Sequence, residues 1–441
     1  MSPPTLPEEL LEQILLHLRV MPDKDHDEEN KLRVDTLLAC VRVSKAMARI
    51  ASVALYHTLD MLSTDHQKYV PLILHLARRP ALARHVKQLF ALDMRLEQDH
   101  DIETLCIRSE AMFVKSAVAV ARDTAGLSPE MIEDLIETFS FSPYSACMIV
   151  LLALCPHIET LEFNTPFPIP TKDPIIITLL RKLTRLREVT VGQSQLSALE
   201  TNDIIPLLSS PQLRTLRLKE IVWTERSSLA TGQTSRLEHL YLTYTSISTG
   251  GLISVLSTFP FLQTLHIEWY PGGDFPGVVP FHDLGITLQQ RGSRLRNLRF
   301  DTNLRNSEGC RLSTQIASLA SLDNLRYLSL PSEALVADGT NDDGGTNVPQ
   351  DPTPSPWSPL ATVVPRSLRL LRVYDEWNTE GEALRVDEQL ALLMGDPGFS
   401  QLRRIRVRRR AAFTADAKAL GWSEVALDNQ YWMMLDRKVA R

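Results

Sequence analysis

The sequence predicts an α/β protein in which a short N-terminal module of three helices precedes a long solenoid of strand–helix repeats. One observation is a stripe of apolar residues at helical spacing near the N-terminus. A second is a leucine-based pattern that recurs from residue 158 to residue 407. The third is the length, because 441 residues are too many for one compact core. We therefore expect successive modules along the chain.

The first helix is predicted at residues 5–19, TLPEELLEQILLHLR, in which leucine and isoleucine recur three and four positions apart. Thr5 and Glu8 have the spacing of a capping box, and Pro7 suits a first helical turn. Residues 21–31 are polar and acidic, which predicts a loop. A second helix is expected from about Asp35 to Val41. Ser44 is expected to cap a third helix, with an apolar face made by Met47, Ile50, Ala51 and Ala54.

Two segments in this region, LPEELLEQILLHL and LLACVRVSKAMARIASVALYHTLDM, resemble the F-box, especially the fungal type with its closing LY-tL-l segment. The resemblance covers nearly all of residues 5–61, although the acidic loop is longer than a minimal F-box connection. It implies that the segment binds the Skp adaptor of SCF-type cullin–RING ubiquitin ligases. The positions that match the adaptor interface are Leu6, Pro7, Leu10, Ile14, Leu18, Val43 and Ser44. The alternative is that Leu10, Ile14 and Leu18 are the core of a small helical cap.

The repeated pattern is an apolar residue, two variable residues, an apolar residue, one variable residue and a further apolar residue. Its middle positions lie 24 residues apart at the closest, from Leu216 to Leu240, and 43 at the widest, from Leu328 to Leu371. We find nine instances: Ile158-Leu161-Phe163, Leu186-Val189-Val191, Leu213-Leu216-Leu218, Leu237-Leu240-Leu242, Leu262-Leu265-Ile267, Leu295-Leu298-Phe300, Leu325-Leu328-Leu330, Leu368-Leu371-Val373 and Leu402-Ile405-Val407.

A short strand followed by a helical segment, such as 202–209 or 251–258, is typical of an irregular leucine-rich repeat. Only Asn303 occupies the asparagine position of that repeat. We therefore predict an F-box at residues 1–61, a helical junction and N-terminal cap at 62–157, a leucine-rich-repeat solenoid at 158–410 and a C-terminal cap at 411–441. Parallel strands would line the concave face and helices the convex face.

Three segments of the junction are expected to be ordered: helices at Val70–Ala77 and Ser128–Phe139, and a degenerate first strand at His85–Met94. Two insertions are expected within the repeats. Residues 270–285 enlarge one repeat, and residues 338–359 are rich in Pro, Gly, Asp and Thr, which predicts disorder. The second insertion is either a binding or phosphorylation loop or, as we favour, a solvated insertion.

Composition restricts the environment and the chemistry of the protein. Net charge is -6, which gives no general affinity for nucleic acid. The five cysteines form no CxxC pair, so we expect neither disulfides nor a zinc site, and a cytoplasmic or nuclear location. The longest apolar run, residues 146–155, is too short to span a membrane. Cys147 and Cys155, on or beside this run, are expected to be buried rather than reactive.

No motif of an enzyme is present: the sequence lacks a phosphate-binding P-loop, GxGxxG, HExxH and GxSxG, so we expect neither catalysis nor a cofactor. The glycine pairs at Gly250, Gly272 and Gly344 are interpreted as turns or loops. Residues 403–410 contain six arginines. Nucleic-acid binding is one interpretation of this run, but a solvated strand or an anionic protein partner suits the acidic chain better.

The residue between the two flanking apolar residues of each strand should face the concave surface. These positions are Glu162, Thr190, Arg217, Tyr241, His266, Arg299, Ser329, Arg372 and Arg406. Four are arginine, which predicts capture of an acidic or phosphorylated protein segment, with substrate contacts from Arg217, Tyr241, His266, Arg299, Arg372 and Arg406. The alternative is that the arginines only keep the strands soluble. The expected function is a non-catalytic substrate receptor, and its rival is a leucine-rich-repeat scaffold or inhibitor without a ligase role.

Overall fold

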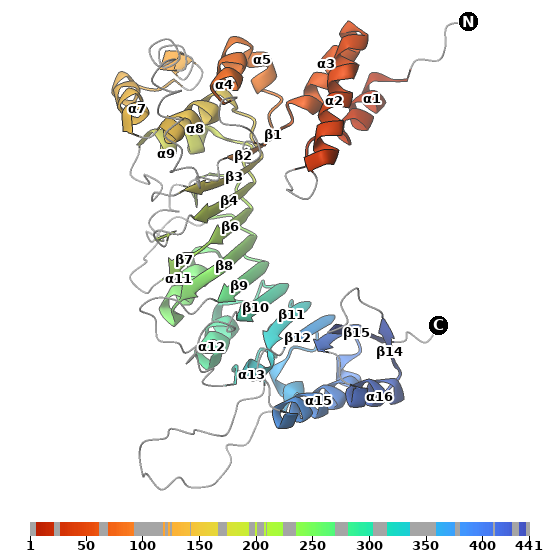
Figure 1. The fold of residues 1–441 in the computed structure, drawn as a ribbon. Coiled ribbons are helices and arrows are strands. Elements are labelled where there is room, and N and C mark those ends of the chain that lie inside the picture. The colour runs from red at the N-terminus through yellow and green to blue at the C-terminus, as the bar shows by residue number, and fades with distance from the viewer. Residues whose placement is uncertain are drawn as a thin grey trace, which may run out of the picture. The chain divides into compact units, whose positions relative to one another are not determined.

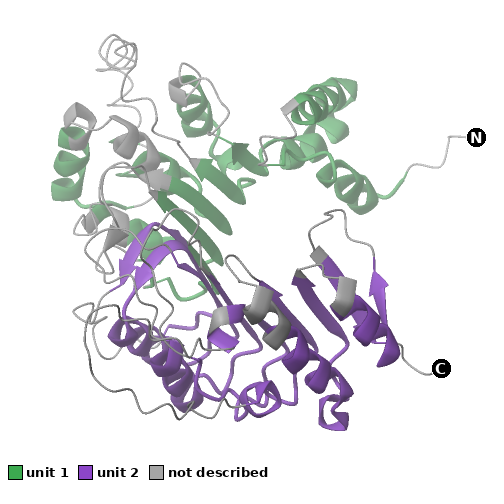
Figure 2. Cartoon of the chain, turned by 60° about the horizontal axis from the view of Figure 1, so that its bottom comes forward, with its two compact units in different colours: residues 1–217 green, residues 218–441 purple. Residues whose placement is uncertain are grey.

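The structure is a computed structural model of the whole chain, and it divides into two compact units, residues 1–217 and 218–441 (Figure 2). It describes residues 6–21, 27–60, 69–91, 118–119, 122–123, 126–141, 143–165, 174–193, 199–200, 207–208, 210–223, 235–269, 281–302, 315–335, 359–374, 380–408, 411–425 and 432–437.

The first unit opens with three packed helices, α1 (Glu8–Leu16), α2 (Asp27–Val43) and α3 (Lys45–Leu55) (Figure 1). Ser44 caps α3 as expected, because its side chain accepts a hydrogen bond from the Met47 amide at 3.1 Å. α1 begins one residue after Pro7, whose carbonyl accepts from the next turn, and Thr5 lies outside the described residues. The helices share a core of their own, made of Leu15, Leu37, Ile50, Ala51 and Ala54.

The extent of α2 corrects the sequence-based expectation of a loop as far as residue 31. α2 is already helical at Asp27 and runs for 17 residues. Its acidic first turn is favourable at the positive end of a helix, and Glu29 pairs with Arg33 one turn later at 2.5 Å. Asn30 exchanges hydrogen bonds with the backbone of Met21. Polar composition therefore indicated exposure in this segment rather than a loop.

The rest of the first unit alternates helices with strands that pair in parallel. β2 pairs with β1 and with β3, and β3 pairs with β4, each in parallel register. The helices predicted at 70–77 and 128–139 are α4 and α7, and the degenerate strand predicted at 85–94 contains β2. The elements are β1 (Thr58–Asp60), α4 (Tyr69–Arg78), α5 (Pro80–Ala83), β2 (Gln88–Ala91), α7 (Pro129–Phe141), α8 (Pro143–Leu154), β3 (Thr160–Thr165), α9 (Pro174–Lys182), β4 (Glu188–Gln193), β5 (Leu199–Glu200) and β6 (Thr215–Lys219), whose last two residues belong to the second unit.

The second unit continues the same alternation and ends in an antiparallel pair (Figure 1). Strands β8 to β13 pair in parallel with their neighbours in chain order. The elements are β7 (Ile221–Trp223), β8 (His239–Ile247), α11 (Thr249–Thr258), β9 (Thr264–Trp269), α12 (Phe281–Arg291), β10 (Asn297–Thr302), β11 (Tyr327–Pro331), α13 (Ser332–Leu335), α14 (Leu360–Val363), β12 (Leu370–Tyr374), α15 (Glu380–Gly395), a 3-10 turn (Pro397–Phe399), β13 (Arg404–Arg408), α16 (Ala411–Ala419), β14 (Trp422–Val425) and β15 (Trp432–Arg437).

All nine strands predicted from the leucine pattern are present, as β3, β4, β6 and β8 to β13. The pattern is a burial pattern: the middle apolar positions Leu265, Leu298, Leu328, Leu371 and Ile405 lie side by side in register and are all fully buried. Equivalent residues of successive repeats thus stack into a continuous apolar ladder, as in a leucine-rich-repeat solenoid. The fold class is α/β, with three N-terminal helices followed by a mostly parallel repeat sheet.

Two expectations about glycine and the insertions are corrected. Gly250 lies in the first turn of α11 rather than in a loop, and α12 already begins at Phe281, within the insertion expected at 270–285. Gly272, Gly344, Asn303 and the insertion 338–358 lie outside the described residues, as does most of the helix expected at 202–209.

Candidate binding surfaces

Helix α1 is apolar on two sides, and only one of them packs against the rest of the helical module. Leu15 is buried in the core shared with α2 and α3, and Leu11 and Leu18 pack against the same core. In contrast, Leu6, Leu10 and Ile14 are 53%, 45% and 51% exposed. Leu10 and Ile14 are one helical turn apart on α1, and Leu6 lies two residues before the helix begins. We call these three exposed residues, just before α1 and along its first two turns, the apolar stripe.

This arrangement contradicts the interpretation of Leu10 and Ile14 as core residues of a helical cap. Among the seven residues expected to contact the adaptor, Leu18 is the one that belongs partly to the core. Pro7 is exposed beside the stripe, and Val43 at the end of α2 is 72% exposed. Ser44 is exposed too, but its hydroxyl group is engaged in capping α3.

Two further exposed leucines on α2 were missed by reasoning from the sequence. Leu32 is 67% exposed and Leu38 is 40% exposed. Leu32 lies in a segment that was expected to be part of a loop, so its place on a helix surface was not considered. The apolar surface of the helical module is therefore larger than the seven matched positions indicate.

A second surface lies on the sheet of the second unit, on the face opposite α11 and α12. Ile267 and Phe300 point toward these helices, so the residues that alternate with them point the other way. Strand register places the central residues of neighbouring strands side by side in one row, which we call the arginine row. From β8 to β13 it consists of Tyr241, His266, Arg299, Ser329, Arg372 and Arg406.

Asp301 balances the charge at the β10 part of this row. Its carboxylate accepts hydrogen bonds from Arg299, and its Oδ2 lies 3.4 Å from His266 Nε2. Burial alone would raise the pKa of Asp301, but the hydrogen bonds from His266 and Arg299 and the charges of Arg299 and Arg372 hold it below its ordinary value. Glu268, in register with Asp301, has a raised pKa because of burial and this neighbouring carboxylate.

At the β12 and β13 end of the row, positive charges are close to one another. Arg372 and Arg406 are direct neighbours in register, and the pKa of Arg406 is lowered first by burial and then by the charges of Arg372 and Arg299. The guanidinium of Arg372 also lies 5.9 Å from the ring of Tyr374. Ser329, between Arg299 and Arg372, is fully buried, and its Oγ has no hydrogen-bond partner among the described residues.

The remaining central residues lie in the first unit and differ from the arginine row in charge and burial. Arg217 forms an ion pair with Glu188 at 2.9 Å, so its charge is balanced on the sheet itself. Thr190 is buried, with 6% of its surface exposed, and Glu162 is partly buried. Of the six residues expected to contact substrate, the structure thus brings five together in one unit and places Arg217 in the other.

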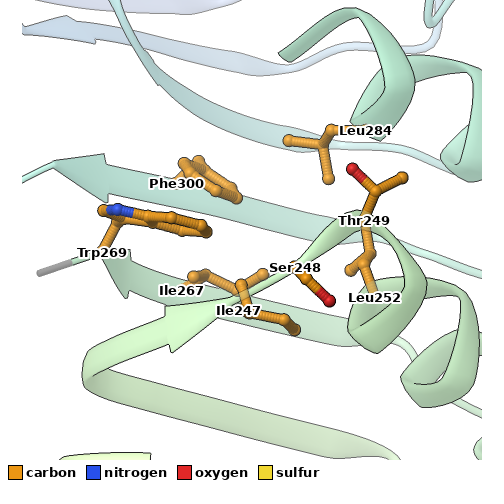
Figure 3. Close-up of a pocket in the computed structure, with 8 residues that line it drawn as sticks. All are labelled: Ile247, Ser248, Thr249, Leu252, Ile267, Trp269, Leu284 and Phe300. Carbon is orange, nitrogen blue, oxygen red and sulfur yellow. The ribbon is translucent and has the colours of Figure 1, made fainter. Parts of the chain in front are cut away.

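A small apolar pocket opens between α11, α12 and strands β8 to β10 (Figure 3). The ring of Trp269 stacks on that of Phe300 at one side, and the Ser248 hydroxyl group is engaged in capping α11. No ionisable side chain lines the pocket, so it offers no acid, base or charged group to a ligand. Its lining residues are Ile247, Ser248, Thr249, Leu252, Ile267, Trp269, Leu284 and Phe300.

Cys155 is buried, as expected, and burial raises the pKa of its thiol to about 12, which leaves it unreactive. The side chain of Cys147 lies outside the described residues. Within the described ranges no cluster of three His, Cys, Asp or Glu side chains is placed to hold a metal ion. None of the described helices combines the length and the apolar character needed to cross a membrane.

No protein-family model matches the chain, and no curated protein matches it significantly.

Proposed function

We propose that the chain is the non-catalytic substrate-recognition subunit of an SCF-type cullin–RING ubiquitin ligase. In this proposal helices α1 to α3 bind the Skp adaptor, and the repeat strands bind a protein substrate. Ubiquitylation would then gain from proximity, because the receptor holds the substrate near a conjugating enzyme, and the catalytic groups would come from other subunits.

The exposed stripe of α1 is the observation that carries the proposal. Leu6, Leu10 and Ile14 remain about half exposed although the same helix already buries Leu15 against its own module. Apolar surface left in water costs about 25 cal/mol for each Å² that a partner would cover. A contiguous apolar stripe on an otherwise completed module is typical of a protein-binding surface.

The identity of the partner follows from the resemblance of residues 5–61 to the F-box. The stripe consists of positions that match the adaptor interface of that family, and two further matched positions, Pro7 before α1 and Val43 at the end of α2, are exposed as well. The exposure of these positions supports the proposal.

The test is co-purification of the full chain with a Skp adaptor. The double variant Leu10→Asp with Pro7→Ala places a charge in the stripe and should abolish the complex, because such interfaces depend on a few buried anchors. Since Leu10 is exposed in the free protein, the variant should fold normally, with an unchanged circular dichroism spectrum and thermal midpoint.

Leu392→Asp is the matched control, because Leu392 is an exposed leucine on α15 and receives the same substitution. This variant should bind the adaptor as the unmodified chain does. Normal adaptor binding by the Leu10→Asp, Pro7→Ala variant would contradict the proposal and favour a leucine-rich-repeat scaffold or inhibitor. The same conclusion would follow if the unmodified chain formed no complex.

A further inference from the structure

We propose that the edge of the repeat sheet at which strands β10 to β13 begin binds an extended, carboxylate-rich segment of a protein partner. The binding residues are four arginines, one immediately before each strand, which we call the strand-start row: Arg296, Arg326, Arg369 and Arg403. The inference goes beyond the proposed function, because this row belongs neither to the adaptor-binding helices nor to the arginine row on the face of the sheet.

Strand pairing brings the four arginines of the strand-start row side by side. The first residues of β10, β11, β12 and β13 are in register, and each arginine immediately precedes one of them. The backbone N–H of Arg326 donates to the Arg296 carbonyl at 2.7 Å, and that of Arg369 donates to the Arg326 carbonyl at 2.8 Å. The Arg403 N–H continues the series to the Arg369 carbonyl at 2.9 Å. Neighbouring strands lie about 4.8 Å apart, so the row spans roughly 14 Å.

The positive charge of the strand-start row is not balanced by the described residues. Arg296, Arg369 and Arg403 are exposed, and no described carboxylate forms an ion pair with any arginine of the row. The turns that lead into the four strands contain six arginines and a single acidic residue, Asp323: residues 292–296, 321–326, 365–369 and 400–403. Like charges on neighbouring strands repel one another, and an anionic ligand would offset that repulsion.

Hydrogen bonds between neighbouring turns hold this edge in place. Arg326 is partly buried, and its Nη1 donates to two neutral acceptors in the next repeats, the Ser367 carbonyl at 2.9 Å and Gln401 Oε1 at 2.8 Å. The Asn324 side chain donates to the Ser293 carbonyl at 2.9 Å. The backbone that carries the row is therefore ordered before a ligand arrives, which reduces the entropy lost on binding.

The chemistry of the strand-start row favours carboxylates on an extended chain. All four residues are arginine, and a planar guanidinium can pair with a carboxylate through two parallel hydrogen bonds, which lysine cannot do. An extended chain advances about 3.3 Å per residue, so roughly four or five residues span the row. A run of Asp or Glu of that length would place carboxylates within reach of every arginine.

Single-stranded nucleic acid also carries a line of negative charges, but its binding sites combine cations with exposed aromatic rings on which bases stack. Among the described residues of this edge, the exposed aromatic ring is Phe261, which precedes β9 and so lies beyond the end of the row. The Arg294 guanidinium lies over this ring, 4.8 Å from its centroid. The row itself therefore offers charge without a stacking surface, which suits an acidic polypeptide better.

The experiment measures binding of a short fluorescent peptide with a run of about six glutamates, long enough to span the row, to the full chain by anisotropy. The matched peptide carries glutamine in place of each glutamate. We expect the glutamine peptide to bind at least about tenfold more weakly, and rising salt to weaken binding of the glutamate peptide. Replacing Arg369 and Arg403 together by Gln should weaken that binding roughly tenfold or more. Both residues are exposed, so the thermal midpoint should not change.

The variant Arg291→Gln with Arg404→Gln is the matched control, because it removes the same number of charges from the second unit. Arg291 on α12 donates to the Ser257 hydroxyl group, and Arg404 pairs with Asp436 at 3.1 Å. This variant should bind the glutamate peptide within about threefold of the unmodified chain.

A variant with lysine at positions 369 and 403 keeps both charges and separates charge from geometry. It should bind more weakly than the unmodified chain and more tightly than the Gln variant, since lysine cannot form the paired hydrogen bonds.

Equal affinity for the glutamate and glutamine peptides would overturn the inference, as would full binding by the Arg369→Gln, Arg403→Gln variant. A larger loss in an Arg372→Gln, Arg406→Gln variant than in the strand-start variant would move the site to the face of the sheet and overturn it too. Displacement of the peptide by single-stranded RNA at lower concentration than by unlabelled glutamate peptide would contradict the choice of a protein partner. None of these results bears on the adaptor interface, which co-purification tests separately.

Discussion

Single residues determine how closely a helix can begin beside a strand in this protein, and Gly251 is the clearest example. The Ser248 amide donates to the Trp223 carbonyl at 3.0 Å, and the Ser248 hydroxyl group accepts from the Gly251 amide at 3.0 Å. The start of α11 is thus held against the end of β7. A β-carbon at Gly251 would lie 2.4 Å from the Trp223 carbonyl oxygen, which is backbone and has no rotamer to move away. Glycine is required here for close approach rather than for a turn.

Gly251→Ala should therefore destabilise the protein by about 1–3 kcal/mol, the usual cost of forcing extra atoms into a packed region. The free energy of unfolding in urea measures the change. Gly395→Ala is the control: its β-carbon would meet Leu420 at an ordinary 3.8 Å, and alanine is the better helix former. An equal loss of stability in both variants would show that the contact with Trp223 is unimportant.

At the scale of elements, the contact between α15 and α16 contains a carboxyl group in unfavourable surroundings. Asp387 of α15 is partly buried, and burial together with the charge of Asp416 on α16 raises its pKa from 3.8 to about 7. The folded protein therefore keeps a proton on Asp387 that the unfolded chain has already lost above its ordinary pKa. Protonation of this group favours the folded state.

The contribution of Asp387 to stability is complete below about pH 4 and is lost as the pH rises through about 7. Asp387→Asn should remove this contribution, so the variant should lose less stability than the unmodified chain between pH 5 and 8. Thermal midpoints at both pH values measure it. Glu388→Gln, at an exposed neighbouring position, should follow the unmodified chain, and identical curves for all three proteins would contradict the assignment.

For the molecule as a whole, a repeat sheet needs an end that does not expose its apolar ladder. In the second unit the last parallel strand, β13, pairs with the antiparallel strand β15, which in turn pairs with β14. Ile405 of the ladder is opposite Leu435, and both are fully buried. An exposed strand edge is a template for aggregation, so this hairpin should protect the unit from self-association.

Leu435→Asp should therefore cost about 3 kcal/mol or more and lead to aggregation, because it buries an unpaired charge at the end of the ladder. Denaturant unfolding and size-exclusion chromatography measure the two effects. Met434→Asp is the matched control: Met434 is adjacent on β15, is only partly buried and lies opposite Arg406. Similar behaviour of both variants would mean that the hairpin is not an essential end cap.

The repeat strands and most helices could be predicted from the sequence because they follow from local periodicity. Alternation of buried leucines marks each strand, and the apolar spacing in residues 128–139 marks α7. The predicted start of α2 was too late for a related reason, because the exposed acidic first turn has no apolar periodicity that would mark it as helix. The charges at Asp27 and Glu28 do favour a helix N-terminus.

Tertiary structure alone decided how each apolar or charged residue is used. Leu10 and Leu15 have the same chemistry in one predicted stripe, but α2 and α3 cover Leu15 and leave Leu10 exposed. The arginines at 299, 372 and 406 were each expected on a strand surface, whereas their grouping around Ser329 depends on register between strands that are distant in the chain. Periodicity is a local property and can be recognised in a segment. Burial by a neighbour and strand register are non-local, and they exist only once the chain has folded.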